Sequence, residues 1–274
     1  MKKTNNQVLL QVKIVAFIVW VSLSACSGPH KEKGTIENNT DHTAKAPPDQ
    51  PTERNYRVYM DISHGQKFWN NPNDMVKTAG NNYERVKWMT SQIQNTASSV
   101  DASVGYFNSG ITAEGLTDCD LLFIHIPSTQ YSEEEVSSII KFVEDGGSLF
   151  LVMDEDYWTN LTKTNVNDII KPFDIQFGGN SPDKKSGGHT KAGVITNESM
   201  KVNCHGTRTL TGGTAFCFQD QSEEAFGVYK ELENGGKMVV MGDGMASLYM
   251  TEWDGVKGYP SHEFMQMVFQ WLLG

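Results

Sequence analysis

The stretch that decides the fold is DLLFIHIPSTQYSEEEVSSIIKFVEDGGSLFLVMDED, residues 120–156. It begins with a continuous apolar run over residues 121–126, which is typical of a central parallel strand buried on both faces. Ser132 and Glu135 then have the spacing of a capping box, and apolar residues follow at helical intervals up to Val143. The stretch therefore predicts a buried strand followed by an amphipathic helix.

A glycine pair and a second strand complete this unit. Gly146-Gly147 ends the helix, and the apolar run over residues 148–153 predicts a strand that stops at acidic residues. The same order returns at Gly235-Gly236, which precede a predicted strand over residues 237–241 that also ends near an aspartate. Glycine adopts backbone shapes that other residues avoid, so each pair marks a turn. We interpret the similarity of the two segments as convergence on the same local turn-and-strand pattern rather than as an internal repeat.

Strands and helices alternate outward from this unit, through residues 58–153. The other predicted strands and helices lie at residues 58–60, 83–93, 104–107 and 261–272. Residues 174–232 are richer in Gly, Thr and Asn, which predicts shorter, partly antiparallel strands at a sheet edge. The right-handed crossover rule then predicts a flavodoxin-like α/β fold: a mainly parallel sheet with helices on both faces and a β-rich insertion.

The N-terminal residues have the layout of a lipoprotein signal peptide. Three lysines flank an apolar stretch over residues 14–23, which is too short to span a membrane. Ser24-Ala25-Cys26 follows, and small residues before a cysteine allow cleavage there and lipidation of its sulfur. We predict that residues 1–25 are removed and that a lipid on Cys26 anchors the protein in a membrane. The alternative is an ordinary secretory leader with an incidental cysteine.

Two segments follow the leader. Residues 26–55 combine prolines and polar residues with almost no large apolar side chain, which predicts a flexible tether behind the lipidated cysteine. Residues 56–274 have the length of one α/β domain with a substantial core. The predicted location is the cell envelope, at the outer membrane, the periplasmic face or the cell surface, and the leaflet stays open.

The charge of the chain restricts its partners. Removing the leader takes away three lysines and no acidic residue, so the 23 basic and 33 acidic residues become 20 and 33, and the formal charge moves from −10 to −13. A surface this acidic is unlike those that bind nucleic acid or anionic lipid head groups. The predicted partners are the membrane, through the lipid, and a glycan fragment or another envelope protein.

Three cysteines remain beside the anchor. An oxidising compartment permits a bridge between Cys204 and Cys217, and the spacing leaves the bridged and the free states equally open. Cys119 is left unpaired, next to the buried strand that follows it. The pair Cys204-His205 lacks the spacing of a zinc site, so we predict no metal and no cofactor.

Polar residues gather where the predicted strands end. In an open α/β sheet, ligands bind beyond the carboxyl ends of the strands, where the strand order reverses. The candidates for ligand binding there are Asp61, Ser63, His64, Gln66, Trp69, Asp154, Glu155 and Asp243, with the segment His125–Ser128 and Asp156 beside them. A histidine near carboxylates can act as a general base or bind a metal. The structural alternative is that the aspartates cap helices and the histidine bonds within its loop.

Two further features belong to the same hypothesis. Phe68, Trp69 and Trp158 follow predicted strands and are suited to stacking on a sugar ring. His189 lies in a glycine-rich segment, which we interpret as a mobile loop that covers the site.

The order of several motifs resembles the class I glutamine amidotransferase-like superfamily. The motifs are Asp61-x-x-His64-Gly65, Asp120 before its strand, Ser132–Glu135 through Gly146–Leu149, Gly242–Met245, Trp253 and Trp271-Leu272. More particularly, the chain resembles the branch found in bacterial envelope proteins and appended to unsaturated rhamnogalacturonyl hydrolases, over about residues 56–274. This resemblance implies a flavodoxin-like fold and a role among polysaccharide-utilisation proteins.

The resemblance does not extend to the amidotransferase mechanism. Active members place a nucleophilic cysteine in the turn after a strand, whereas the corresponding strand here ends in Met153-Asp154-Glu155. We therefore predict an envelope lipoprotein with a degenerate site that binds a carbohydrate or a partner protein. One alternative is a hydrolase acting on a glycoside or ester of a glycan, with Asp61, His64 and Asp154 or Asp243 at its site. Another is a purely structural assembly protein.

Overall fold

The structure is a computed structural model that describes residues 55–66, 69, 83–253 and 256–274. The predicted leader, the lipidated cysteine and the tether up to residue 54 lie outside these residues, as does Phe68. Among the helices of the described ranges, none has the length and apolar character needed to cross a membrane.

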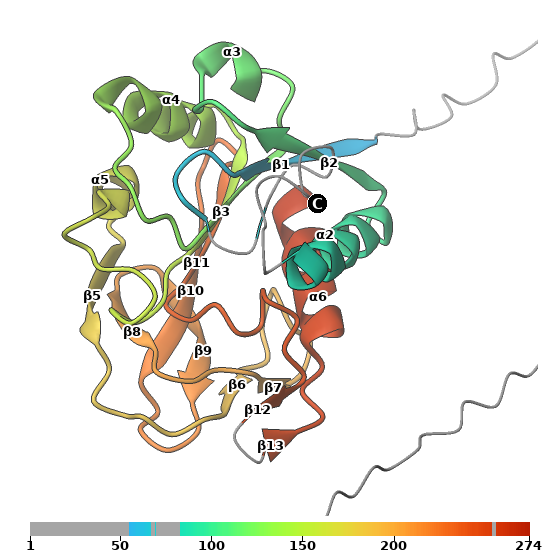
Figure 1. Cartoon of the computed structure of the whole chain (residues 1–274), viewed down its shortest axis with the longest axis vertical. Helices are drawn as coiled ribbons and strands as arrows, with labels where there is room; N and C mark the ends of the chain where they lie inside the picture. Colours follow the sequence, from blue (N-terminus) through green and yellow to red (C-terminus); the bar gives the residue numbers. More distant parts are fainter. Residues whose placement is uncertain (1–54, 67–68, 70–82, 254–255) are drawn as a thin grey trace, which may run out of the picture. The chain divides into compact units, whose positions relative to one another are not determined.

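Nine strands form one sheet, in the order β2-β1-β3-β4-β11-β10-β9-β6-β7 (Figure 1). Their bounds are β1 Tyr56–Asp61, β2 Ala102–Phe107, β3 Leu121–His125, β4 Ser148–Val152, β6 Gly188–Thr190, β7 Lys201–Val202, β9 Thr214–Gln219, β10 Ala225–Glu231 and β11 Lys237–Met241. The first five strands in this order pair in parallel, and the other four add antiparallel. The α/β class and a parallel core sheet are confirmed, and the order β2-β1-β3-β4-β11 is compatible with a flavodoxin-like fold.

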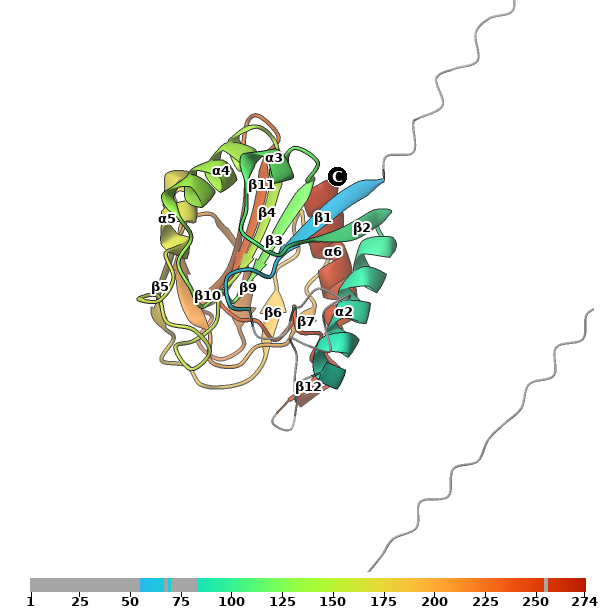
Figure 2. The same cartoon turned by 45° about the horizontal axis from the view of Figure 1, so that its top comes forward.

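The described residues also form helices and two small two-stranded sheets. The helices are α2 Tyr83–Ser98, α3 Ala113–Leu116, α4 Glu133–Glu144, α5 Val166–Ile170, the 3₁₀ turn η2 Lys171–Phe173 and α6 Ser261–Leu273. Strand β5 (Gln176–Asn180) pairs with β8 (Arg208–Thr211), and β12 (Glu252–Trp253) pairs with β13 (Val256–Lys257). Helices α2 and α6 contact each other and run side by side in both views (Figures 1 and 2).

The side chains of the central strands are divided between two hydrophobic clusters, one on each face of the strands. Successive residues of a strand point to opposite faces, so Phe123 of β3 joins one cluster and Leu122 joins the other. The first cluster contains Ile93 of α2 and Phe264 of α6, and the second contains Ile139 of α4. All five residues of β3 are buried, as the continuous apolar run predicts.

The predicted capping box is present at the start of α4. The Ser132 hydroxyl accepts a hydrogen bond from the backbone N–H of Glu135 at 3.2 Å, and the Ser132 N–H donates to Glu135 Oε2 at 2.8 Å. This reciprocal pairing satisfies donors that a helix start would otherwise leave open. The helix therefore begins where the sequence predicts.

The two glycine-pair turns pack against each other, which explains their similar sequences. Because β4 and β11 are parallel neighbours with Lys237 opposite Ser148, the turns before them meet at the amino edge of the sheet. A Cβ atom on Gly236 would lie 2.1 Å from the carbonyl oxygen of Val143, in the last turn of α4. Only a residue without a side chain fits this approach.

The β-rich insertion forms as predicted, with one correction inside it and one open question answered. Strands β10, β9, β6 and β7 extend the sheet in antiparallel fashion. The prediction of a mobile loop at His189 is wrong, because His189 lies in β6 between Phe218 of β9 and Lys201 of β7. Both Cys204 and Cys217 are buried free thiols, so the bridged state is not the one found.

We predict that Gly236→Ala will lower the free energy of unfolding by about 1–3 kcal/mol, because the added methyl group overpacks the junction of the two turns. Gly179→Ala is the matched control, since a Cβ atom there meets nothing within 4 Å. Neither glycine has a left-handed backbone. Urea unfolding followed by circular dichroism measures both changes, and equal stability of the two variants would contradict the packing of the turns.

Candidate functional site

The strand order divides the predicted site into two clusters at one edge of the sheet. Asp61 ends β1 and His125 ends β3, and these strands are neighbours where the strand order reverses. Asp154 and Asp243 follow β4 and β11, which are also neighbours. All four residues are buried.

The first cluster, which we call the Asp61 cluster, consists of Asp61, Ser63, His64, Gln66, Tyr131 and Glu135. Asp61 is fully buried, and its carboxylate accepts hydrogen bonds from the Ser63 hydroxyl, the Gln66 amide and the Tyr131 hydroxyl, each at 2.7 Å. Burial favours the neutral acid, but the hydrogen bond and charge of His64, with the Tyr131 bond, outweigh it and lower the pKa of Asp61. The cluster therefore holds a buried, ionised carboxylate.

His64 lies between two carboxylates. Its Nδ1 is 2.9 Å from Asp61 Oδ2, its Nε2 is 3.4 Å from Glu135 Oε1, and its ring stacks on Tyr131 with centroids 3.8 Å apart. Burial disfavours the charged ring, but the bond and charge of Asp61, followed by Glu135, raise the pKa of His64 above its usual value. The imidazolium form is thus stabilised, and it ties the loop after β1 to the first turn of α4.

This geometry argues against a catalytic triad at His64. The Ser63 hydroxyl is 3.1 Å from the same Nδ1 that contacts Asp61, whereas a triad needs the hydroxyl and the carboxylate on opposite ring nitrogens. Ser63 also donates to Asp61, and both ring nitrogens of His64 face carboxylates. The ring therefore has no position from which to accept a proton from a nucleophile.

The second cluster is an acidic pair, Asp154 and Asp243. Asp154 accepts backbone N–H bonds from Glu155 and Gly244 at 2.7 and 3.0 Å, and Asp243 accepts from His205 and Met245 at 2.8 Å each. Burial raises the pKa of Asp243 to about 7, and burial together with the Asp243 charge raises the pKa of Asp154 well above its usual range. At neutral pH the pair therefore retains a proton.

Charged side chains surround the acidic pair on the loop after β4. Glu155 pairs with Lys184 at 2.8 Å, and Asp156 pairs with Arg208 at 2.8 Å. The Arg208 side chain is itself buried and also donates to three backbone carbonyls, including that of Asp154 at 2.9 Å. Tyr157 follows on the same loop with 78% of its surface exposed. Across the described ranges, no group of three or more acidic, histidine or cysteine side chains could hold a metal ion.

The aromatic candidates Trp69 and Trp158 differ in how deeply they are buried. Trp69 is 1% exposed and packs against Phe123 and His125, so its ring belongs to the core. Trp158 is half-buried against the first hydrophobic cluster and meets the exposed ring of Tyr157 edge to face, with centroids 5.1 Å apart. An aromatic surface at this edge therefore comes from Tyr157, which sequence reasoning misses.

Sequence reasoning also misses several other residues of the site, because their partners are distant along the chain. They are Tyr131, Glu135 and Arg208. Tyr131 bonds to Asp61 across 70 positions, and Arg208 bonds to the carbonyl of Asp154 across 54 positions, so local spacing carries no signal for either contact. One signal in the sequence could have indicated Arg208. It is an arginine within a Gly/Thr-rich segment of predicted strands, and a guanidinium buried among strands requires hydrogen-bond partners.

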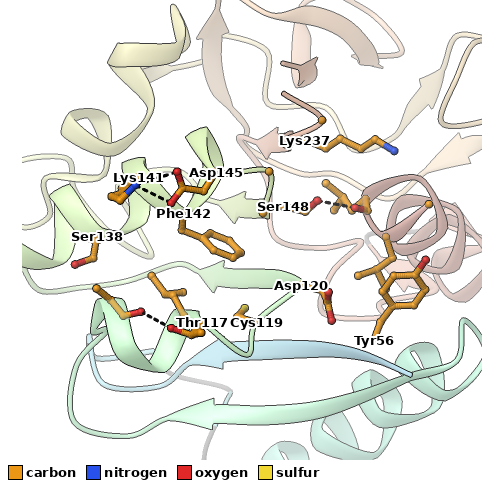
Figure 3. A pocket seen from close by; sticks show the side chains of 18 of the residues that line it. Tyr56, Thr117, Cys119, Asp120, Ser138, Lys141, Phe142, Asp145, Ser148 and Lys237 are labelled. Carbon is orange, nitrogen blue, oxygen red and sulfur yellow. Dashed lines mark hydrogen bonds and ion pairs between the residues drawn. The ribbon is translucent and has the colours of Figure 1, made fainter. Parts of the chain in front are cut away.

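One cavity lies at the opposite edge from these charges. It has a volume of about 820 Å³ and is bounded by the amino ends of β1, β3, β4 and β11 (Figure 3). Two of its polar side chains are paired with close neighbours: Lys141 with Asp145 at 2.8 Å, and Ser148 with the carbonyl of Leu272 at 2.6 Å. A smaller cavity of about 450 Å³ lies beside Glu135, at the carboxyl edge.

Comparison with known proteins gives the following similarities. The family model of the IFT52 GIFT domain matches residues 90–184. The mmIFT52 N-terminal domain is similar with a TM-score of 0.57 and 14% identity, over 79% of this chain and 96% of that chain. This similarity shows the fold alone.

Two further solved structures are similar at lower scores. One is a GMP synthase-like protein from Thermoplasma acidophilum, with a TM-score of 0.46 and 9% identity over 80% of this chain and 93% of that chain. The other is a ThuA-like protein from Bacteroides uniformis, with a TM-score of 0.47 and 10% identity over 82% and 94%. No curated protein matches the chain.

We predict that His64→Gln will lower the free energy of unfolding by about 1–3 kcal/mol at pH 6, because the neutral amide leaves the Asp61 carboxylate without its cation. A raised folded-state pKa contributes stability that is complete below the unfolded value of 6.5 and is lost as the pH rises through the folded value. The loss should therefore be smaller at pH 9. Chemical denaturation at both pH values measures it, with the exposed His262→Gln as control. An equal loss at both pH values would refute the charged pairing.

Proposed function

We propose that this chain is an envelope lipoprotein whose amidotransferase-like α/β domain binds a carbohydrate at the carboxyl edge of its sheet, in the service of polysaccharide utilisation. We also infer a full flavodoxin-like arrangement with helices on both faces. The two hydrophobic clusters support that arrangement, since one includes side chains of α2 and α6 and the other includes side chains of α4 and α5.

The observation that carries this proposal is the exposed ring of Tyr157 beside fixed charged groups. Sugar binding combines an aromatic face, which covers the apolar side of the ring, with polar groups that bond to hydroxyls. Tyr157 supplies the face, while ion pairs hold the carboxylates of Glu155 and Asp156, the two residues that precede it on the loop. Bound hydroxyl groups would donate to these carboxylate oxygens.

The lack of a usable thiol among the described residues supports binding over amidotransferase chemistry. Thiolates are the nucleophilic form of cysteine, and burial raises the pKa of Cys119, Cys204 and Cys217 far above the usual range. The strand end at Met153-Asp154 offers a carboxylate where the enzymes of the superfamily have their cysteine. A carboxylate cannot take over glutaminase chemistry at that position.

A glycoside hydrolase is the second candidate, and the acidic pair favours it. A buried carboxyl with a pKa of about 7 keeps a sizeable protonated fraction at neutral pH, as a general acid requires, and Asp243 has this property. Asp61 and His64 support this candidate less well, because each is fully bonded within its cluster. Release of reducing sugar from oligosaccharides would favour this candidate over simple binding.

We predict that Tyr157→Ala will weaken oligosaccharide binding by about five- to tenfold, since an aromatic contact is worth about 1 kcal/mol. Tyr157→Phe should retain most of the affinity because it keeps the ring. Screening on a glycan array identifies the ligand, and isothermal titration calorimetry then measures the dissociation constants. Trp88→Ala is the matched control, because Trp88 is also an exposed aromatic residue but lies on α2. If no glycan on the array binds the wild-type chain, the carbohydrate proposal is wrong.

The lipid anchor makes a separate prediction. In cells fed a palmitate analogue, the wild-type protein should incorporate the label, and Cys26→Ser should abolish incorporation because the variant has no thiol at the cleavage site. Cys119→Ser should leave labelling unchanged, since Cys119 is buried in the folded domain. Equal labelling of the wild type and Cys26→Ser would exclude the predicted anchor.

A further inference from the structure

We propose that Ser186 and His205 form a nucleophile–base pair that transfers the acyl group of a carboxylic ester. The Ser186 Oγ lies 2.7 Å from the His205 Nδ1, which is within the range required for direct proton transfer between a nucleophile and its base. Both residues are half-buried, so neither belongs to the fully buried core. It lies at the carboxyl edge of the sheet, beside the acidic pair.

Ser186 is held on both sides along the chain. Two residues before it, Lys184 pairs with Glu155 at 2.8 Å. Immediately after it, Gly187 donates its N–H to the carbonyl of Cys204 at 3.0 Å and has a left-handed backbone with φ of +105°. A side chain is disfavoured in that conformation, so the glycine allows the sharp turn that presents the serine.

His205 is held by the segment that faces Ser186. Its backbone N–H donates to Asp243 Oδ2 at 2.8 Å, which fixes the residue to the end of β11. Gly206 follows with φ of +71°, and a Cβ atom there would lie 2.6 Å from the Glu155 carboxyl carbon. Glu155 therefore contacts both segments, through Lys184 and through Gly206, and keeps the serine and the imidazole together.

The pair differs from the serine–histidine contact at His64. There, the serine shares Nδ1 with Asp61, and the ring is held as an imidazolium between two carboxylates. At His205, Nδ1 meets the Ser186 hydroxyl, so the tautomer with its proton on Nε2 can accept the hydroxyl proton. The hydroxyl of Ser186 thus faces Nδ1 of His205, whereas a carboxylate faces each ring nitrogen of His64.

The reaction balances with water as the only co-reactant. His205 Nδ1 takes the Ser186 proton as Oγ bonds to the acyl carbon, and the imidazolium returns that proton to the departing alkoxide as the ester C–O bond breaks. Water then attacks the acyl-serine, His205 takes its proton, the Oγ–acyl bond breaks, and the proton returns to Oγ. The products are an alcohol and a carboxylic acid.

The substrate class follows from the neighbouring loop and rests on the proposed function. Glu155, which contacts both segments of the pair, is two residues before the exposed Tyr157. A sugar bound against the ring of Tyr157 would place its substituents near the segments that carry Ser186 and His205. We therefore assign an O-acylated carbohydrate, of which simple acyl esters are the minimal analogues.

The test uses the full chain with 4-nitrophenyl acetate and with a fluorophosphonate probe, which phosphonylates nucleophilic serines. We expect ester turnover in the wild type, a loss of about 10²–10⁴-fold in kcat/KM for Ser186→Ala and for His205→Gln, and no change for Ser91→Ala. Ser91 is an exposed serine on α2. Mass spectrometry of the labelled wild type should place the phosphonyl group on Ser186.

Turnover that Ser186→Ala retains, or a wild type without turnover and without labelling, would overturn the proposal. Should Ser186→Ala fail to fold by circular dichroism, the position of the label on the wild type decides. Glycan binding is measured on the same preparations. Binding without ester turnover removes only the acyl-transfer proposal, whereas turnover without glycan binding removes only the carbohydrate proposal.

Discussion

The burial of β3 and β4 on both faces is the constraint on which the rest of the structure depends. Every residue of both strands is buried, and alternate side chains enter different hydrophobic clusters. Strands buried in this way pair in parallel, and consecutive parallel strands need a crossover connection, which is usually a helix such as α4 between β3 and β4. All carboxyl ends of the core strands consequently meet at one edge, which is where Asp61, Asp154 and Asp243 are found.

Collecting carboxylates at one buried edge is electrostatically unfavourable. Two different arrangements of the neighbouring groups reduce this cost. Around Asp61, three donors and the imidazolium of His64 stabilise the ionised form, so the pKa of the acid falls. Around Asp154 and Asp243 the donors are backbone N–H groups, so burial dominates and a proton is retained. The charges of the Asp61 cluster are therefore fixed, whereas the charge of the acidic pair can change.

Sequence reasoning reaches the parts of the molecule that local patterns determine. The capping box at Ser132, the buried strand after Asp120 and the aspartates at strand ends are all set by neighbours within a few residues. It misplaces His189 because the strand there is formed by pairing with Phe218, 29 positions away, and a glycine-rich segment resembles a loop until that pairing is known. The contact of His64 with Glu135 and the partners of Arg208 escape it for the same reason, since they depend on the tertiary fold.

The β-rich insertion is therefore part of the site and not an appendage to it. Arg208 is buried, and its guanidinium bonds to the carbonyl of Asp154, to Asp156 and to the carbonyl of Thr159. Its own backbone N–H donates to the carbonyl of Gly242 at 2.7 Å, so one residue joins the insertion to the ends of both β4 and β11. Because a buried guanidinium is stable only when its donors are paired, the insertion and the acidic edge must form together. These bonds of Arg208 fix the position of the insertion relative to the ends of β4 and β11.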